Sequence, residues 1–241
     1  MNLAVLIPAY QPDAILLEVV REILEAGFRR VIVVDDGSTR PHCAAVFACL
    51  RDTPRVEVRA HPHNRGKGAA LNTGLEYFRA TIPLDSRELG VITVDADGQH
   101  RLPDILRVAR ELEEHPDSLV LGSRTFREDC VPLGRRIGSV LQRLFVRLVL
   151  GRDIRDPQTG LRAIPTDWVV DLLAIPHTGY EWETQMLWEC RRRPIRQVFM
   201  ESIYIDDNKS SHFHPVKDTL RLYFAILRSR LLEMFSRSRE S

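Results

Sequence analysis

The stretch VITVDADGQHRLPDIL, residues 91–106, decides the fold. Its first four residues are apolar without polar alternation, which is typical of a strand in a sheet that is covered on both faces. Two carboxylates and a Gly-Gln-His run follow at the end of this strand, and a helix is expected from Pro103. In an open α/β sheet, ligands bind beyond the carboxyl ends of the strands. The stretch therefore predicts a mostly parallel sheet with chemically active side chains at that edge.

The chain on the N-terminal side repeats the alternation of strand and helix. Strands are expected at 3–7, 31–34, 56–59, 91–94 and 119–123, and helices at 14–26, 41–51, 67–80 and 103–114. Helices of this length between strands imply crossover connections. The fold class is therefore α/β, a doubly wound mostly parallel sheet flanked by helices.

The second half of the chain is less regular. It predicts helices near 134–149, 166–174 and 181–193, a loop over 155–160, an extended stretch over 195–205 and a long C-terminal helix from about 215. No repeat and no long linker interrupts the sequence. Residues 1–241 are therefore expected to form a single domain, whose first 125 residues make one doubly wound unit.

The composition is that of an ordinary globular protein. Lys and Arg number 34 against 33 Asp and Glu, and 44% of the residues are hydrophobic. Nucleic-acid-binding proteins usually carry a basic excess or stripe, so no nucleic-acid partner is expected. The opening MNLAVLIPAY lacks the pattern of a signal peptide, and no window approaches eighteen apolar residues. We expect no transmembrane helix, and we expect the four cysteines to be reduced thiols.

The motif DADGQH offers oxygen ligands to a cation. A turn at Ala96 to Gly98 would bring the carboxylates of Asp95 and Asp97 and the amide oxygen of Gln99 together. Such hard ligands suit Mg²⁺ or Mn²⁺ held with a diphosphate. The same residues also fit an ordinary polar turn into a helix that starts at Pro103. Both interpretations are open on the sequence alone.

Two further motifs place polar residues at element ends. In VVDDGS, residues 33–38, Asp35 and Asp36 could accept hydrogen bonds from a base or ribose, or could simply form a turn and a helix cap. In NRGKG, residues 64–68, Lys67 at a helix start could face phosphate, or the glycines could only permit the loop. Neither motif has the spacing of a P-loop or a dinucleotide fingerprint.

Arginines follow the fifth expected strand. The guanidinium groups of Arg124 and Arg135 could form bidentate hydrogen bonds with phosphate, although most arginines are merely exposed to solvent. The expected helices at 134–149 and 215–235 interleave apolar and basic residues. Helices of this kind can lie in a membrane interface, or can pack on a core or on a second subunit, which leaves a homo-oligomer open.

Six motifs occur in one order along residues 8–162, namely PAYQP, VVDDGS, NRGKG, VDADGQH, GSR and DPQTGLR. Together they resemble the family 2 inverting glycosyltransferases of GT-A fold, and among these the dolichol-phosphate mannosyltransferase-like branch that glycosylates polyprenyl phosphates. The resemblance implies a nucleotide-binding half over 1–125, an acceptor-side half over 126–214 and a C-terminal basic amphipathic helix over 215–241.

The resemblance also implies roles for single residues. Asp36 would contact the base or ribose with support from Asp35, and Asp95, Asp97 and Gln99 would hold Mg²⁺ or Mn²⁺ against the donor diphosphate. Arg124 and Arg135 would contact the acceptor phosphate. Residues 158–162 would separate the donor sugar from the acceptor. The remaining residues implied to line the donor site are Pro8, Ala9, Tyr10, Lys67 and Ala96.

The catalytic base is open on the sequence. A hydroxyl acceptor needs a carboxylate to take its proton, whereas a phosphate acceptor is already an anion. Relatives often carry two carboxylates in a pattern like FDxE near YEWETQML, residues 180–187. Glu183 matches the first position, either as a base or as an ordinary helix residue, and Gln185 replaces the second.

The leading hypothesis is a metal-dependent enzyme that moves a hexose from a nucleotide-diphosphate sugar to a polyprenyl phosphate. It would work in the cytoplasm, peripherally on the inner face of the cell membrane. The alternatives are a soluble glycan or other hydroxyl acceptor, and a nucleotide-sugar-binding homologue without turnover.

Overall fold

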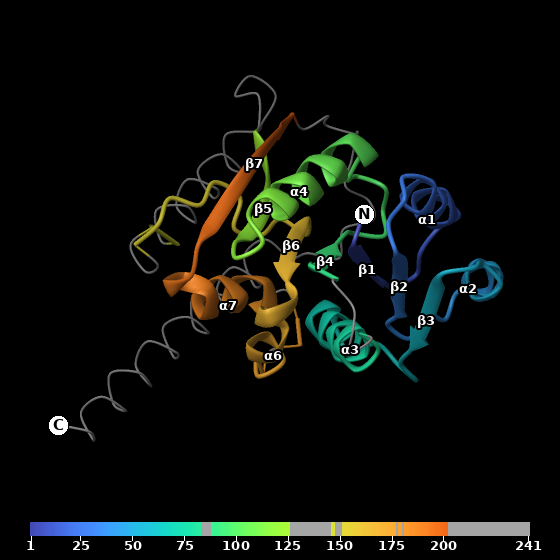
Figure 1. Ribbon diagram of the computed structural model, residues 1–241. Coiled ribbons are helices and arrows are strands. Elements are labelled where there is room, and N and C mark those ends of the chain that lie inside the picture. The colour runs from blue at the N-terminus through green and yellow to red at the C-terminus, as the bar shows by residue number, and fades with distance from the viewer. Residues whose placement is uncertain (83–87, 126–145, 148–150, 177, 180, 202–241) are drawn as a thin grey trace.

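The computed structural model describes residues 1–82, 88–125, 146–147, 151–176, 178–179 and 181–201 (Figure 1). In the first part of the chain, strands and helices alternate. The elements there are β1 (Leu3–Ala9), α1 (Ile15–Glu25), β2 (Arg30–Asp35), α2 (Pro41–Arg51), β3 (Val56–Ala60), α3 (Lys67–Ala80), β4 (Gly90–Thr93), α4 (Leu102–Glu114) and β5 (Leu119–Thr125). The elements that follow are β6 (Arg162–Pro165), the 3₁₀ turn η2 (Thr166–Trp168), α6 (Val169–Leu172), α7 (Glu181–Glu189), η3 (Cys190–Arg192) and β7 (Ile195–Glu201).

These strands form one seven-stranded sheet in the order β3-β2-β1-β4-β6-β5-β7. All neighbouring pairs are parallel except those of β6, which is antiparallel to both β4 and β5. The carboxyl ends of β1, β2, β4 and β5 therefore lie along one edge of the sheet, where ligands bind in folds of this kind.

Helices cover both faces of the sheet (Figure 1). Alternate residues of β1 enter two different cores, with Val5 and Ile7 packed on the side of α1, α2 and α4, and Leu6 packed on the side of α3, α6 and α7. This double burial explains why the strands are continuous apolar runs rather than alternating ones.

The structure confirms the expected α/β class and the strands and helices of the first 125 residues, to within one or two residues at their ends in most cases. The first 125 residues supply β1 to β5 of the predicted doubly wound sheet, but not the whole of it. β6 separates β4 from β5, and β7 pairs with β5, so strands from the second half complete the sheet. The sequence interpretation missed β6 because a buried run of four residues shows no periodicity of its own.

Several other expectations can be compared with the described residues. The helix expected at 166–174 is the shorter pair η2 and α6, and the extended stretch begins as β7. Most of the helix expected at 134–149 and the whole C-terminal helix lie outside the described residues. In the part that is described, no helix is both long enough and apolar enough to span a bilayer. Cys43, Cys49 and Cys190 are free thiols.

Candidate active site

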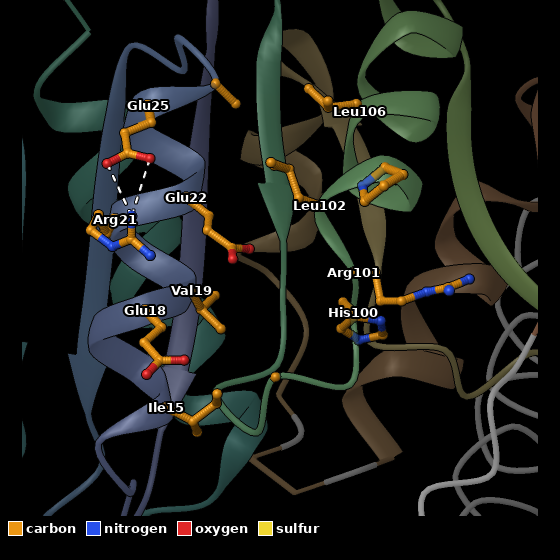
Figure 2. Close-up of a pocket in the computed structure, with 13 residues that line it drawn as sticks. Ile15, Glu18, Val19, Arg21, Glu22, Glu25, His100, Arg101, Leu102 and Leu106 are labelled. Carbon is orange, nitrogen blue, oxygen red and sulfur yellow. Dashed lines mark hydrogen bonds and ion pairs between the residues drawn. The ribbon is translucent and has the colours of Figure 1, made fainter.

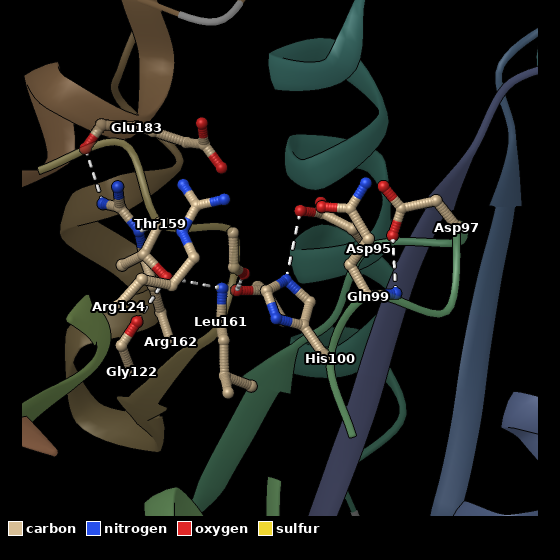
Figure 3. Close-up of polar contacts among 12 residues, drawn as sticks. Asp95, Asp97, Gln99, His100, Gly122, Arg124, Thr159, Leu161, Arg162 and Glu183 are labelled. Carbon is tan, nitrogen blue, oxygen red and sulfur yellow. Dashed lines mark hydrogen bonds and ion pairs between the residues drawn. The ribbon is translucent and has the colours of Figure 1, made fainter. Parts of the chain in front are cut away.

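Charged side chains from four separate segments meet at the carboxyl edge of the sheet. Asp95 and Asp97 follow β4, and Arg124 is the last residue but one of β5. Lys67 begins α3, and Glu183 lies in the first turn of α7. Figure 3 shows Asp95, Asp97 and Gln99 gathered at the turn after β4, with Arg124 and Glu183 on the other side of the site. The cluster thus joins the two halves of the chain.

Asp95 is held by two cationic or polar partners. Its Oδ1 lies 2.7 Å from Lys67 Nζ, and its Oδ2 lies 3.1 Å from His100 Nε2. Desolvation alone would raise the pKa of Asp95, but the Lys67 ammonium and the His100 contact outweigh it and hold the pKa far below its usual range. Asp95 is therefore a stable carboxylate.

Lys67 bridges two carboxylates. Its Nζ also lies 2.9 Å from Glu183 Oε1, and its side chain is 17% exposed. Burial by itself would lower the pKa of Lys67, yet the charges of Asp95 and Glu183 raise it well above its usual value. The ammonium stays charged and ties the end of β4 to α7.

Glu183 is buried, with 5% of its side chain exposed and its Oε1 against Lys67. A carboxylate that is both paired and enclosed is poorly placed to take a proton from a hydroxyl acceptor. Gln185, the second position of the same motif, is also buried and donates from Nε2 to Glu189 Oε1 at 2.9 Å. The helix face thus offers a paired carboxylate and an amide.

Asp97 and Gln99 complete the turn after β4. The backbone N–H of Gln99 donates to Asp97 Oδ1 at 3.0 Å, and both residues are exposed. Desolvation by the surrounding chain, followed by the charge of Asp95, raises the pKa of Asp97. Two carboxylates that repel each other beside an amide oxygen are a donor set that a hard divalent cation fits. Among the described residues, no three acidic, His or Cys side chains already stand in ligand geometry.

Arg124 pairs with Asp156 of the DPQTG loop. Its Nε donates to Asp156 Oδ2 at 2.7 Å, and the pKa of Arg124 is raised, chiefly by the Asp156 charge. The side chain of Arg124 is about one-third exposed. Arg135, the other arginine expected here, lies outside the described residues.

Arg162, which the family resemblance implied in the wall between donor sugar and acceptor, is 1% exposed. Its guanidinium donates to three backbone carbonyls, of Pro157 at 2.9 Å, Thr159 at 2.8 Å and Glu183 at 2.5 Å. Burial lowers the pKa of Arg162, although the nearby charges of Glu183 and Asp156 oppose this. The side chain fixes the DPQTG loop to the start of α7.

Gly160 of the same loop packs directly on Asp95. A Cβ at this position would lie 2.2 Å from Asp95 Oδ2, and the Gly160 carbonyl accepts from Thr93 Oγ1 at 2.7 Å. No larger residue fits while Asp95 keeps its place.

The two aspartates after β2 differ in their surroundings. Asp36 is 3% exposed and accepts from the amides of Arg65 and Gly66, both at 2.9 Å, while its Oδ1 lies 2.7 Å from His61 Nδ1. Asp35 is half-buried and accepts only the Ser38 amide at 2.8 Å among the contacts described. The geometry thus gives Asp36 a role in shaping the loop before α3 and leaves Asp35 the more accessible carboxylate.

The start of α3 is packed against another segment. The Ala69 amide donates to the Thr178 carbonyl at 3.0 Å, and a Cβ on Gly68 would lie 2.7 Å from Trp182 Cβ. Gly68 is therefore explained by close packing on α7 and on the segment before it, a contact that was not expected from the sequence. The ammonium of Lys67 contacts the carboxylates of Asp95 and Glu183.

The remaining candidates surround this edge. Ala9 is 1% exposed and pairs with Asp35 in the sheet, Pro8 is half-buried, and Tyr10 is 39% exposed. Ala96 is half-buried against the core. Only Tyr10 of this group presents a large side chain to solvent.

A groove of about 740 Å³ lies between α1 and α4 (Figure 2). Glu18, Glu22 and Glu25 line one wall, and Arg101 lies on the other. Gly98 and His100 also line this groove, but none of the charged side chains of the cluster does. The charged cluster, and not this groove, is the candidate site.

Sequence reasoning missed the residues that support this cluster. His100 and Asp156 stand inside quoted motifs, so their side-chain chemistry was visible, but their partners were not. His61 had no signal, because its contact with Asp36 depends on how the chain returns after β3.

The fold is that of the GT-A glycosyltransferases. The family model described as Glycosyl transferase family 2 matches residues 4–170, so the chain belongs to that family. It is similar to a dolichyl-phosphate beta-glucosyltransferase of Trichomonas vaginalis, at 25% identity over 90% of this chain and 71% of that protein. It is also 28% identical to an undecaprenyl-phosphate mannosyltransferase of Micrococcus luteus, over 73% of this chain and 72% of that protein.

Two solved structures show the same fold. The mannosyl-3-phosphoglycerate synthase of Rubrobacter xylanophilus superposes with a TM-score of 0.67 at 21% identity, over 98% of this chain and 75% of that chain. The mannosyltransferase of Pyrobaculum calidifontis in complex with GDP-Man and Mn²⁺ gives a TM-score of 0.55 at 17% identity, over 86% of this chain and 58% of that chain.

Proposed function

We propose that this family 2 glycosyltransferase moves a hexose from a nucleoside diphosphate sugar to a polyprenyl phosphate, with inversion and with a divalent cation. The names of the sequence relatives support the acceptor, since they act on dolichyl phosphate or undecaprenyl phosphate. The segments 134–149 and 215–235 are the parts we propose to contact the membrane surface.

The observation that supports the proposal most strongly is the burial and ion pairing of Glu183. It is enclosed and paired with Lys67. Asp156 is paired with Arg124 in the same way. Inversion requires in-line attack on the anomeric carbon, and a hydroxyl acceptor would need a free carboxylate to remove its proton. A phosphate acceptor is already ionised, so it needs neither Glu183 nor Asp156 as a base.

The divalent cation would be held by Asp95, Asp97 and Gln99. When bound, it would supply neutralisation of the charge that develops on the departing nucleoside diphosphate. Support comes from the oxygen donors of the turn and from the raised pKa of Asp97, whose repulsion from Asp95 a cation would relieve. A structural neighbour carries Mn²⁺ with GDP-Man, which agrees with this choice of cation.

The chain's own residues would orient the two substrates. Asp35 would accept hydrogen bonds from the nucleoside, because it is the more accessible of the two aspartates after β2. The exposed part of Arg124 would attract the acceptor phosphate, with Asp156 fixing the guanidinium. Gly160 would hold the Asp95 carboxylate in position.

The experiment is transfer of radiolabelled sugar from a panel of uridine and guanosine diphosphate sugars into organic-extractable product. Each reaction contains polyprenyl phosphate, with Mg²⁺, Mn²⁺ or chelator. We expect a labelled lipid that disappears with chelator and with Asp97→Asn. Label in a water-soluble glycan, or turnover that ignores lipid phosphate, would contradict the acceptor. Equal turnover in chelator would contradict the cation.

A further inference from the structure

Lys67 is the one lysine within the described residues, and it occupies an unusual place for an ammonium group. It lies between the proposed cation ligand Asp95 at 2.7 Å and Glu183 at 2.9 Å, and little of it reaches solvent. The other oxygen of Asp95 faces His100. Both oxygens of this carboxylate therefore have partners without any metal.

We propose that Lys67 is a positioning residue that acts as a resident counter-cation, holding Asp95 between β4 and α7 and competing with a divalent cation for that carboxylate. This inference rests on the cation site of the proposed function. It adds that the Lys67 ammonium already offsets part of the negative charge of the site in the free protein, so that the site binds the cation weakly until a nucleoside diphosphate brings further negative charge.

The physical reason is the balance of charge at close range. A positive charge in hydrogen-bond contact with Asp95 reduces the attraction that this carboxylate exerts on a second cation, and enclosure from water strengthens the effect. Asp97 is exposed and accepts the backbone N–H of Gln99, whereas Asp95 makes the ion pair with Lys67. A cation would thus meet Asp97 readily and Asp95 only in competition with the ammonium.

The bridge also explains why Glu183 stays enclosed at the start of α7. Lys67 is shared between Asp95 and Glu183, so each carboxylate has a cationic partner and one of their two negative charges is offset. Arg162 holds the Glu183 carbonyl at 2.5 Å, so the backbone that carries this carboxylate is fixed. The three-residue bridge therefore joins the donor side and the acceptor side of the site.

The test measures Mn²⁺ binding to the full-length protein without nucleotide, by the paramagnetic resonance signal of free Mn²⁺. Lys67→Met should bind Mn²⁺ roughly tenfold more tightly or better than wild type, because Asp95 is released from its competitor. Lys67→Gln, which keeps a hydrogen-bond donor without charge, should shift affinity in the same direction if Lys67→Met fails to fold. Lys67→Arg should leave the affinity near that of wild type.

Arg30→Met is the matched control. Arg30 also makes a buried ion pair, 3.0 Å from Glu88, but at the opposite edge of the sheet. It should leave the Mn²⁺ affinity unchanged. Adding Asp95→Asn to Lys67→Met should remove the gain, which assigns the gain to this carboxylate.

Unchanged or weaker Mn²⁺ binding in both uncharged Lys67 variants overturns the inference. A loss of nucleoside diphosphate affinity with unchanged Mn²⁺ affinity would also overturn it, and would assign Lys67 to the donor phosphates. If wild type binds Mn²⁺ only together with nucleoside diphosphate and the uncharged Lys67 variants behave alike, the proposed cation site stands and the inference fails. If no protein binds Mn²⁺ under any condition, both the cation site and the inference fail.

Discussion

The two adjacent aspartates at the end of β2 illustrate how neighbouring residues of one type acquire different roles. Asp36 accepts two backbone amides and contacts His61 inside the protein. An asparagine at this position would direct its side-chain NH₂ group toward a backbone N–H group and leave both without an acceptor. Asp36→Asn should therefore lower the free energy of unfolding by about 2 kcal/mol or more. Urea denaturation measures this change.

Asp35→Asn is the matched substitution. Its amide oxygen can keep the bond from the Ser38 amide, so the urea midpoint should stay close to that of wild type. The loss of a charge-assisted hydrogen bond should weaken nucleoside diphosphate binding roughly tenfold. The opposite pattern, with Asp35 controlling stability and Asp36 controlling binding, would restore the roles that the family resemblance implied.

Gly160 provides a second prediction at a single residue. In Gly160→Ala the new methyl would meet Asp95, and the bond from Thr93 prevents the loop from retreating. Displacing a carboxylate by about 1 Å at a reacting centre can cost roughly a hundredfold in turnover, and we expect a loss of that size. Steady-state transfer rates measure it.

Gly151→Ala controls for the cost of a side chain on a glycine. Gly151 has a φ of +68° and open space around it, so alanine there should cost about 1 kcal/mol of stability without a change in turnover. If Gly160→Ala kept full turnover, the close packing of Gly160 on Asp95 would not be needed for catalysis.

The sequence predicted the chemistry of the site better than its contacts. Asp95, Lys67 and Arg124 were identified because carboxylates, ammonium and guanidinium groups stand out at element ends. That Lys67 would meet Asp95 and Glu183 could not be predicted, because these contacts depend on how α3 and α7 pack on the same face of the sheet. Local patterns carry no information on such distant pairs.

Between elements, the contact of α3 with the segment before α7 sets the position of Lys67. Alanine at Gly68 would favour the helix by about 1 kcal/mol, but its Cβ would lie 2.7 Å from Trp182 Cβ. Overpacking of this kind costs typically 1–3 kcal/mol. Gly68→Ala should therefore destabilise the protein despite the better helix former, as judged by thermal unfolding. Stabilisation would mean that the two segments separate easily.

The short antiparallel strand β6 marks the limit of prediction at this scale. The strands β1 to β5 were predicted because each is an apolar run next to turn residues and a helix. β6 has four residues, all buried, and directly follows the DPQTG loop, so its strand character comes from pairing with β4 and β5 rather than from its own pattern.

For the molecule as a whole, the order of strands decides what can fold alone. β5 pairs only with β6 and β7 among the described strands, and the core beneath α3 includes Ile164, Trp182 and Met186 from the second half. A fragment ending at residue 125 would lose these partners and leave β4 as an open edge. The halves implied by the sequence are therefore expected to share one cooperative unit, as a single domain requires.

The distribution of tryptophan allows a direct test of this expectation. All three tryptophans, Trp168, Trp182 and Trp188, lie beyond residue 125, whereas α1 to α4 all lie before it. Tryptophan fluorescence therefore reports on the second half alone, whereas far-UV circular dichroism also includes α1 to α4 of the first half. In a single cooperative unit the two urea transitions of the full chain should coincide, and the fragment 1–125 should show no cooperative transition. Separate midpoints, or a fragment that unfolds cooperatively, would show that the first 125 residues fold independently and that β6 and β7 are added to a finished sheet.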